Sequence, residues 1–222
     1  MVPTLYVGNR NYSSWSLRPW LVLKWSRLPF DTTPIPLGGE GYGKGLMPSV
    51  LGVSPTGFVP ALHLGDAVVW DSLAISEWAA ESAPSAHLWP QDPVARAVAR
   101  SATCEMHSGF PALRRSLPCN IRRRASARAH DEDVRRELAR VEVLWTELRS
   151  RFGSGGKYLF GARPTIADAF YTPVATRLRT YGVTLNGPAQ SYAETVLADP
   201  AFVEWEKQAV AEPWTMPQWD LV

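Results

Sequence analysis

Residues 57–75 read GFVPALHLGDAVVWDSLAI, and this stretch decides the first half of the fold. A proline has no amide hydrogen for a sheet ladder, so Pro60 marks the place where a strand begins, and residues 61–64 are expected to form it. Gly65-Asp66 favours a tight hairpin turn between two apolar runs. Residues 67–70 are therefore predicted to return as a second strand.

On either side of this hairpin, the sequence alternates between strand and helix patterns. Asp71-Ser72 supplies side chains that cap helix N-termini. Upstream, leucine and tryptophan side chains recur at helical spacing after a short buried run. Two prolines restrict the next strand to the edge of a sheet. The expected order is strand, helix, strand, a glycine-rich loop with at most one short helix, hairpin and helix, over residues 4–8, 15–27, 30–36, 38–53, 60–70 and 73–82.

After residue 82 the sequence contains only helical patterns. The segment from residue 82 to 93 holds three prolines and no apolar period, so residues 83–92 are predicted to be a linker. Further helices are expected over residues 93–117 (with a kink allowed at Pro111), 131–152, 165–181 and 200–211. The chain is therefore predicted to have an α/β domain over residues 1–82 and an all-helical domain over residues 93–222.

The composition excludes several classes of protein. The 222 residues are 45% hydrophobic with a net charge of +2, which is typical of a globular chain and not of a disordered one. No run approaches the roughly 20 apolar residues of a membrane span. The first residues lack the pattern of a secretory signal. Cys104 and Cys119 are too few for a disulfide framework and wrongly spaced for a zinc or redox motif, so we expect no metal and a reducing, cytoplasmic location.

Six arginines fall within residues 114–128. Because the net charge of the chain is only +2, a nucleic-acid surface is not expected there. A solvated helix end and loop explains the segment. The alternative is that Arg114 or Arg122 faces a cleft and selects negatively charged electrophiles.

Three short motifs carry a resemblance to a known family. Residues 57–62 match G-x-V-P-x-L, residues 71–75 match [ED]-S-x-A-I, and residues 165–168 match the helix-capping pattern [ST]-x-x-D. In this order, the motifs resemble the cytosolic glutathione transferases over nearly the whole chain. The resemblance implies a thioredoxin-like N-terminal domain followed by an all-α domain, and it gives Thr165 and Asp168 a structural role.

Residues 11–18, NYSSWSLR, resemble the S-S-C-x-W-R start of the serine-type zeta class, with Trp15 and Leu17 at the cysteine and tryptophan positions. Residues 105–114, EMHSGFPALR, are similar to a helix found in a bacterial subgroup of the same superfamily. The resemblance thus implies a zeta-like bacterial protein.

The resemblance implies that a serine hydroxyl activates glutathione. A free thiol has a pKa of about 8.5 and is mostly protonated at neutral pH. A hydroxyl hydrogen bond and the positive end of a helix both stabilise the thiolate, and Ser13 and Ser14 stand just before the first helix. Ser13 is favoured as the sulfur ligand, and Tyr6 is the rival. Arg18, one turn further on, would add positive field.

The remaining glutathione contacts follow from the same resemblance. A cis Val59-Pro60 bond would offer its backbone to the cysteinyl unit. A helix N-terminus binds anions, which suits the γ-glutamyl carboxylate. The glycyl carboxylate requires a donor, for which His63 is a poorer candidate than the lysine of the glycine-rich loop. The predicted glutathione-binding residues are Val59, Pro60, Asp71, Ser72 and Lys44.

The helical domain is expected to supply the electrophile pocket, with Trp15, Met106, His107, Phe110 and Arg114 as its lining. A lone histidine on a helix often serves packing alone. The expected function is transfer of glutathione, as a thiolate co-substrate, to an electrophilic small molecule. The alternatives are a zeta-type cis-trans isomerase and a non-catalytic binding protein. A homodimer is expected, and neither nucleic acid nor membrane is an expected partner.

Overall fold

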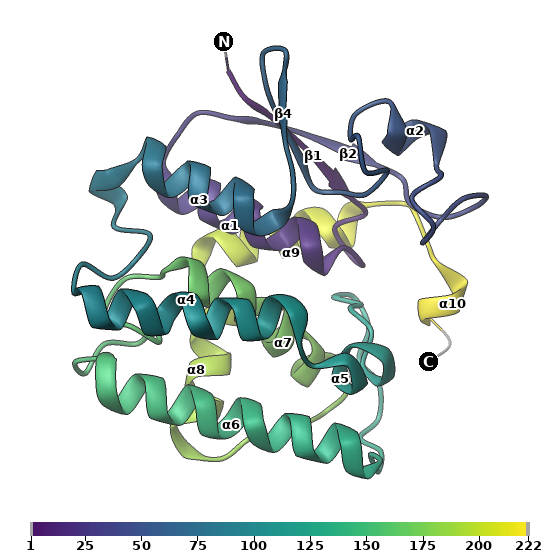
Figure 1. Ribbon diagram of the computed structural model, residues 1–222. Helices are drawn as coiled ribbons and strands as arrows, with labels where there is room; N and C mark the ends of the chain where they lie inside the picture. The colour runs from purple at the N-terminus through teal and green to yellow at the C-terminus, as the bar shows by residue number, and fades with distance from the viewer. Residues whose placement is uncertain (1, 221–222) are drawn as a thin grey trace.

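The computed structural model describes residues 2–220 and shows a sheet domain followed by a helical domain (Figure 1). The strands are β1 (Thr4–Gly8), β2 (Asp31–Ile35), β3 (Ala61–Leu64) and β4 (Ala67–Val69). The helices are α1 (Ser14–Ser26), α2 (Pro48–Leu51), α3 (Ser72–Ser82), the 3-10 turn η1 (Pro84–Ala86), α4 (Pro93–Ser108), α5 (Pro111–Ser116), α6 (Glu132–Phe152), α7 (Ile166–Thr180), α8 (Gly187–Leu197), α9 (Pro200–Ala211) and α10 (Pro217–Asp220). The predicted α/β domain and all-helical domain are confirmed.

The four strands form one mixed sheet in the order β2-β1-β3-β4. β2 runs parallel to β1 at the edge, with Pro34 opposite Val7, where a missing amide hydrogen is tolerated. β3 and β4 pair antiparallel through the turn at Gly65, whose φ of 65° suits glycine. The predicted edge strand and hairpin are therefore confirmed.

Helix α1 lies between the sheet and the helical domain, where it packs against α3, α7 and α9 (Figure 1). Most of its side chains are buried, and Leu17 and Leu21 have no exposed surface. Pro19 is accommodated in the helix. This position places the N-terminus of α1 where the two domains meet.

The prediction of a single helix over residues 93–117 is wrong. The chain breaks between α4 and α5 at Gly109 and Phe110, and Phe110 adopts the left-handed region with a φ of 58°. Helix α8 was also missed, because its first residues, Gly187 and Pro188, read as a loop. Its buried positions nevertheless repeat at helical spacing.

Two contacts tie the helical domain together. Asp168 accepts hydrogen bonds from the Thr165 amide (2.7 Å) and hydroxyl (2.9 Å), which confirms the predicted capping box at the start of α7. Within the predicted linker, Leu88 is buried and its carbonyl accepts from the Ile166 amide (2.9 Å).

Among residues 2–220, no helix combines the length and hydropathy needed to cross a membrane. The domain boundaries remain a prediction.

Candidate active site

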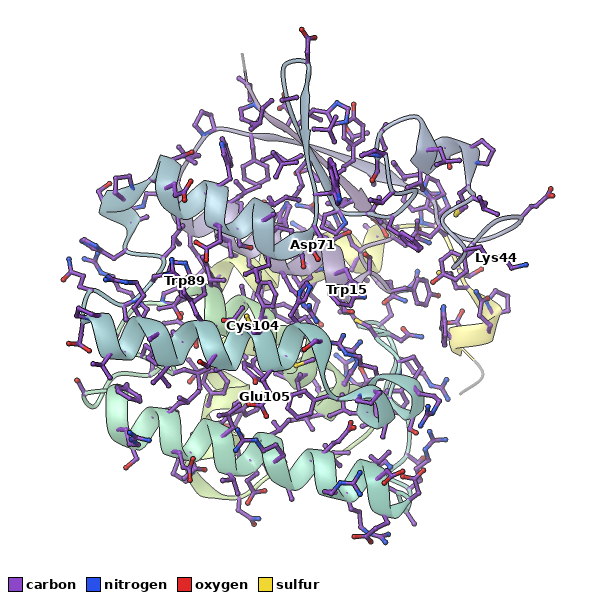
Figure 2. The ribbon with its side chains drawn as sticks, viewed as in Figure 1. Trp15, Lys44, Asp71, Trp89, Cys104 and Glu105 are labelled. Atoms are coloured by element: carbon purple, nitrogen blue, oxygen red, sulfur yellow. The ribbon has the colours of Figure 1, made fainter. Side chains whose placement is uncertain are left out.

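Three cavities meet around Trp15, at the N-terminus of α1. Figure 2 shows Trp15 beside Asp71 in the middle of the molecule, between the sheet domain and α4. We name the cavities after one lining residue each. The Pro60 cavity holds about 410 Å³ and is lined by Trp15, Thr56, Phe58, Val59, Pro60, Trp70, Asp71 and Ser72.

The Ser13 cavity holds about 220 Å³, and Ser13, Val59, Tyr12 and Tyr42 are among its lining residues. The Ser14 cavity holds about 200 Å³ and is lined by Tyr12, Ser14, Trp15, Tyr42, Arg114, Pro118, Cys119, Arg177 and Trp219. A larger cavity of about 530 Å³ lies at the opposite end of α1 beside Lys24 and Arg163. It contains none of the predicted site residues, so the chemistry is assigned to the three cavities around Trp15.

Ser13 is the N-cap residue of α1, and its side chain is nearly buried. Its Oγ accepts from the Ser16 amide at 3.3 Å and donates to Ser16 Oγ at 2.8 Å. Ser16 Oγ also accepts from the Gly8 amide at 3.1 Å. These bonds fix the Ser13 hydroxyl at the positive end of the helix, where negative charge is stabilised.

Ser14, the first residue of α1, is held from the other domain. Its Oγ accepts a hydrogen bond from Arg177 Nη2 at 3.2 Å. Arg177 is itself anchored, since it donates to the Leu117 carbonyl (2.8 Å) and the Pro173 carbonyl (3.1 Å). Burial lowers the pKa of Arg177. Arg177 was not among the predicted site residues. An arginine within a mostly apolar helix could have indicated it, because a buried charge is often functional.

Arg18 and Arg114 both lie over the Trp15 ring, with guanidinium carbons 4.2 Å and 5.0 Å from its centroid. Such cation–π contacts stabilise a cation against an aromatic face. Arg114 donates to the backbone carbonyls of Gly109 (2.9 Å) and Met106. Burial lowers the pKa of Arg114 to about 10, so this side chain stays protonated at neutral pH.

Arg18 has no exposed surface, and none of its three guanidinium nitrogens has a hydrogen-bond partner among the described residues. The Phe170 ring covers it at 4.8 Å. Burial, and then the neighbouring Arg114 and Arg177, lower its pKa. Arg18, Arg114 and Arg177 therefore bring three guanidinium groups to the neighbourhood of Trp15, where Asp71 supplies an opposing negative charge.

In the Pro60 cavity the Val59-Pro60 bond is cis, as the resemblance predicts, and Trp70-Asp71 is cis as well. Asp71 caps α3 by accepting from the Leu73 amide at 2.9 Å. Ser72 is fully buried, and its Oγ has no partner among residues 2–220. An unpartnered hydroxyl at a helix N-terminus fits a carboxylate ligand.

His107, on α4, lies next to Asp71, which lines the Pro60 cavity. Its Nε2 lies 3.1 Å from Asp71 Oδ2, and its ring packs edge-on against Trp15. Burial lowers the pKa of His107, with Arg18 and Arg114 acting in the same direction and Asp71 opposing them. The structure thus brings Asp71, His107 and Trp15 together from two domains.

Other predicted residues lie outside the cavity linings. Met106 and Phe110 are buried in the hydrophobic core. Tyr6 packs its ring on His63, whose Nε2 is bonded to the Val53 carbonyl (2.8 Å). Lys44 follows Gly43 of the Ser13 cavity, but its exposed side chain points outward, away from Trp15 (Figure 2).

The C-terminal segment closes one side of the Ser14 cavity. Trp219 of α10 lines the cavity, and the Tyr12 hydroxyl donates to Asp220 at 2.9 Å. Arg122 braces this segment by donating to the carbonyls of Glu212 (2.9 Å) and Trp214 (2.7 Å). Of the two arginines that could face a cleft, Arg114 therefore lines a cavity, whereas Arg122 serves as a structural tie.

The arrangement is suited to chemistry on anions. The Ser13 and Ser14 hydroxyls stand at a helix N-terminus beside two small cavities, and the walls of the Ser14 cavity include two guanidinium groups. Donors and positive charges at such a place stabilise a thiolate, or negative charge that develops on a substrate.

Comparisons with known proteins agree with this description. Residues 12–82 match the model of the glutathione S-transferase N-terminal domain, and residues 126–209 match the model of the C-terminal domain. A maleylacetoacetate isomerase from Pseudomonas aeruginosa is 31% identical over 214 residues, which cover 89% of this chain and 92% of that protein. A maleylpyruvate isomerase from a Ralstonia species is 29% identical over 82% of this chain and 85% of its own length.

Two solved structures show the same fold. A glutathione transferase homologue from Burkholderia, with bound glutathione, has a TM-score of 0.70 at 23% identity and covers 96% of this chain and 100% of its own. A zeta-class maleylpyruvate isomerase has a TM-score of 0.69 at 21% identity with the same coverage. Family models, relatives and fold agree: the chain belongs to the glutathione S-transferase family and is an enzyme with glutathione as its co-substrate.

Proposed function

We propose that this enzyme holds glutathione as a thiolate at the N-terminus of α1 and adds it to a small, negatively charged electrophile. The observation that carries this proposal is the meeting of Ser13, Ser14 and two cavity-lining arginines around Trp15. The hydroxyl and the helix end each contribute on the order of 1 kcal/mol to thiolate stability. Together they would lower the pKa of the thiol by roughly one to two units.

Glutathione would extend across the Ser13 and Pro60 cavities, which share Trp15, Phe58 and Val59 in their walls. Val59 lies just before β3, and its backbone groups make no hydrogen bond within the described part of the chain, so they are open to the cysteinyl unit. The unpartnered Ser72 hydroxyl would take the γ-glutamyl carboxylate, and Asp71 its α-amino group. Lys44 would have to turn inward to reach the glycyl carboxylate.

The electrophile would occupy the Ser14 cavity, where Arg114 and Arg177 favour a carboxylate-bearing molecule. The Trp15 ring would form the wall between the two substrates, since it lines all three cavities. Cys119 also lines this cavity, but burial raises its thiol pKa, so the reactive sulfur would be that of glutathione.

A second candidate is glutathione-dependent cis-trans isomerisation. Two observations favour it: the arginine-lined cavity, and relatives that are maleylacetoacetate and maleylpyruvate isomerases. The thiolate would add to a cis double bond conjugated with a carbonyl, and the electron pair would move onto the carbonyl oxygen. Rotation about the new single bond and expulsion of the thiolate would then give the trans alkene, with glutathione regenerated.

Retention on immobilised glutathione, followed by turnover of chlorodinitrobenzene and of maleylacetone, tests these proposals. Conjugation of the aryl chloride supports transfer, and double-bond isomerisation of maleylacetone supports the second candidate. Ser13→Ala should raise the pKa of the bound thiol and lower both rates. Retention without any turnover, unchanged in Ser13→Ala, would leave a non-catalytic binding protein.

We infer in addition that the chain forms a homodimer in the cytoplasm. Phe58 and Trp70, at the rim of the Pro60 cavity, have 52% and 47% of their surface exposed in the single chain. Large exposed aromatic side chains beside a site are typical of a surface that a partner covers. Sedimentation equilibrium of the wild-type chain and of Phe58→Asp tests the dimer.

A further inference from the structure

Ser13 and Ser14 are neighbours in the sequence but face different cavities. Ser13 lines the Ser13 cavity together with Val59, on the side proposed for glutathione. Ser14 lines the Ser14 cavity together with Arg114 and Arg177, on the side proposed for the electrophile. The two hydroxyls are therefore placed to act on different molecules.

The hydrogen bonds of the two serines also differ, because one hydroxyl donates its hydrogen within the protein and the other does not. Ser13 Oγ already donates its hydrogen to Ser16 and has a neutral, local network. Ser14 Oγ can only accept from Arg177, because a guanidinium group has donors and no acceptor. The hydrogen of Ser14 has no acceptor among the described residues, and it belongs to a hydroxyl polarised by a positive charge.

Addition of a thiolate to an alkene conjugated with a carbonyl requires such a donor. As the carbon–sulfur bond forms, the alkene electron pair moves, and negative charge collects on the carbonyl oxygen as an enolate. The enolate then either takes a proton from water at carbon, which gives the conjugate, or expels the thiolate, which restores the alkene. In both routes the charged oxygen is transient, and a fixed donor lowers the barrier to it.

We propose that Ser14, held by Arg177, is a catalytic residue that donates its hydroxyl hydrogen to the carbonyl oxygen of an α,β-unsaturated electrophile bearing a carboxylate. This inference rests on the proposed function and assigns a different substrate atom to each of the two serines. Ser13 would turn its hydrogen from Ser16 Oγ to the glutathione sulfur and stabilise the thiolate, and Ser14 would stabilise the oxygen of the second substrate. Arg177 is a positioning residue that acts through Ser14, and its charge adds to the stabilisation.

The matched pair Ser13→Ala and Ser14→Ala tests the assignment in the full chain, with two readouts. The first readout is the pKa of the bound thiol, followed by the ultraviolet absorbance of the thiolate. The second is the ratio of kcat with maleylacetone to kcat with benzyl chloride, from which chloride leaves with the electron pair and no enolate forms. Ser13→Ala should raise the thiol pKa by about one unit and change the ratio little.

Ser14→Ala should leave the thiol pKa in place and lower the ratio about a hundredfold, the usual effect of removing one oxyanion donor. Arg177→Lys should lower the same ratio and add little to Ser14→Ala, because both changes remove one hydrogen bond. A thiol pKa that rises in Ser14→Ala as it does in Ser13→Ala would overturn the inference, as would an unchanged ratio. Absence of glutathione-dependent turnover in the unaltered chain would instead overturn the proposed function, and this inference with it.

Discussion

Asp168 and Arg18 are both charged and fully buried, yet their surroundings are opposite. Asp168 accepts four hydrogen bonds, from the Leu159 amide, the Thr165 amide and hydroxyl, and the Tyr192 hydroxyl. The Arg18 guanidinium has no hydrogen bond within the described chain and lies over the Trp15 and Phe170 rings. Burial raises the pKa of Asp168 and lowers that of Arg18, so both charges are costly to bury.

The difference separates a charge that serves the fold from one that serves the site. The hydrogen bonds of Asp168 tie the start of α7 to the segment before it and to α8, which stabilises the helical domain. The Arg18 guanidinium makes no such connection, and its positive charge lies over the Trp15 ring. A buried group without partners is unusual, and its presence next to the site is consistent with a role in the site.

Removing the Asp168 carboxylate should give the largest loss of stability. Asp168→Ala leaves two buried amides and two hydroxyls without their acceptor, so we expect a loss of about 3 kcal/mol or more in the free energy of unfolding. Urea unfolding followed by circular dichroism measures it. Asp168→Asn keeps one carbonyl oxygen and should cost less. A loss below about 1 kcal/mol for the alanine variant would contradict the structural role.

Replacing Arg18 should separate stability from activity. Arg18→Met preserves much of the side-chain volume and breaks no hydrogen bond, so the free energy of unfolding should change by less than about 1 kcal/mol in either direction. Loss of one positive charge near the thiolate should raise the pKa of bound glutathione by about one unit. Arg163→Met, beside the cavity at the far end of α1, is the control. Equal thiol pKa values in the two variants would remove Arg18 from the site.

Of the three replacements, that of Arg114 should have the smallest effect, and only the binding of charged substrates should change. Arg114→Ala should raise KM for a carboxylate-bearing electrophile about tenfold, from the loss of a charge-assisted hydrogen bond, and leave KM for a neutral one unchanged. The guanidinium is protonated below its pKa of about 10, so the preference for anions should fall only as the pH rises through that value. The exposed neighbour Arg115, changed to alanine, is the matched control. Equal KM changes in both variants would contradict the assignment.

Much of the fold could be predicted because its signals are local. The strand starting after Pro60, the Gly65 turn, the Asp71 cap and the Thr165–Asp168 box each depend on a few adjacent residues. The break at Phe110 could not be predicted from Pro111, because a proline is tolerated in the first turn of a helix as well as at a kink. Tertiary packing decided between the two.

The predicted site residues that the structure brings together are mostly those on segments that carry a motif. Ser13, Val59, Pro60, Asp71 and Ser72 belong to such segments, and the structure places all five in the cavities around Trp15. Met106 and Phe110 were placed in the pocket lining by their helix, yet packing turns them into the core. Arg177 belongs to no motif, and only the crossing of α7 over α1 shows its contact with Ser14.

By itself, the sequence determined where most strands and helices begin, which domain follows which, and that two hydroxyls stand at the start of the first helix. These features depend on backbone hydrogen bonding and on the spacing of apolar side chains, both of which act over short distances along the chain. Only the tertiary structure decided that Arg18, Arg114 and Arg177 converge on Trp15, and that Ser13 and Ser14 face different cavities. The physical reason is that charge and burial at the site depend on helices from both domains, which are distant in sequence and meet only when the chain is packed.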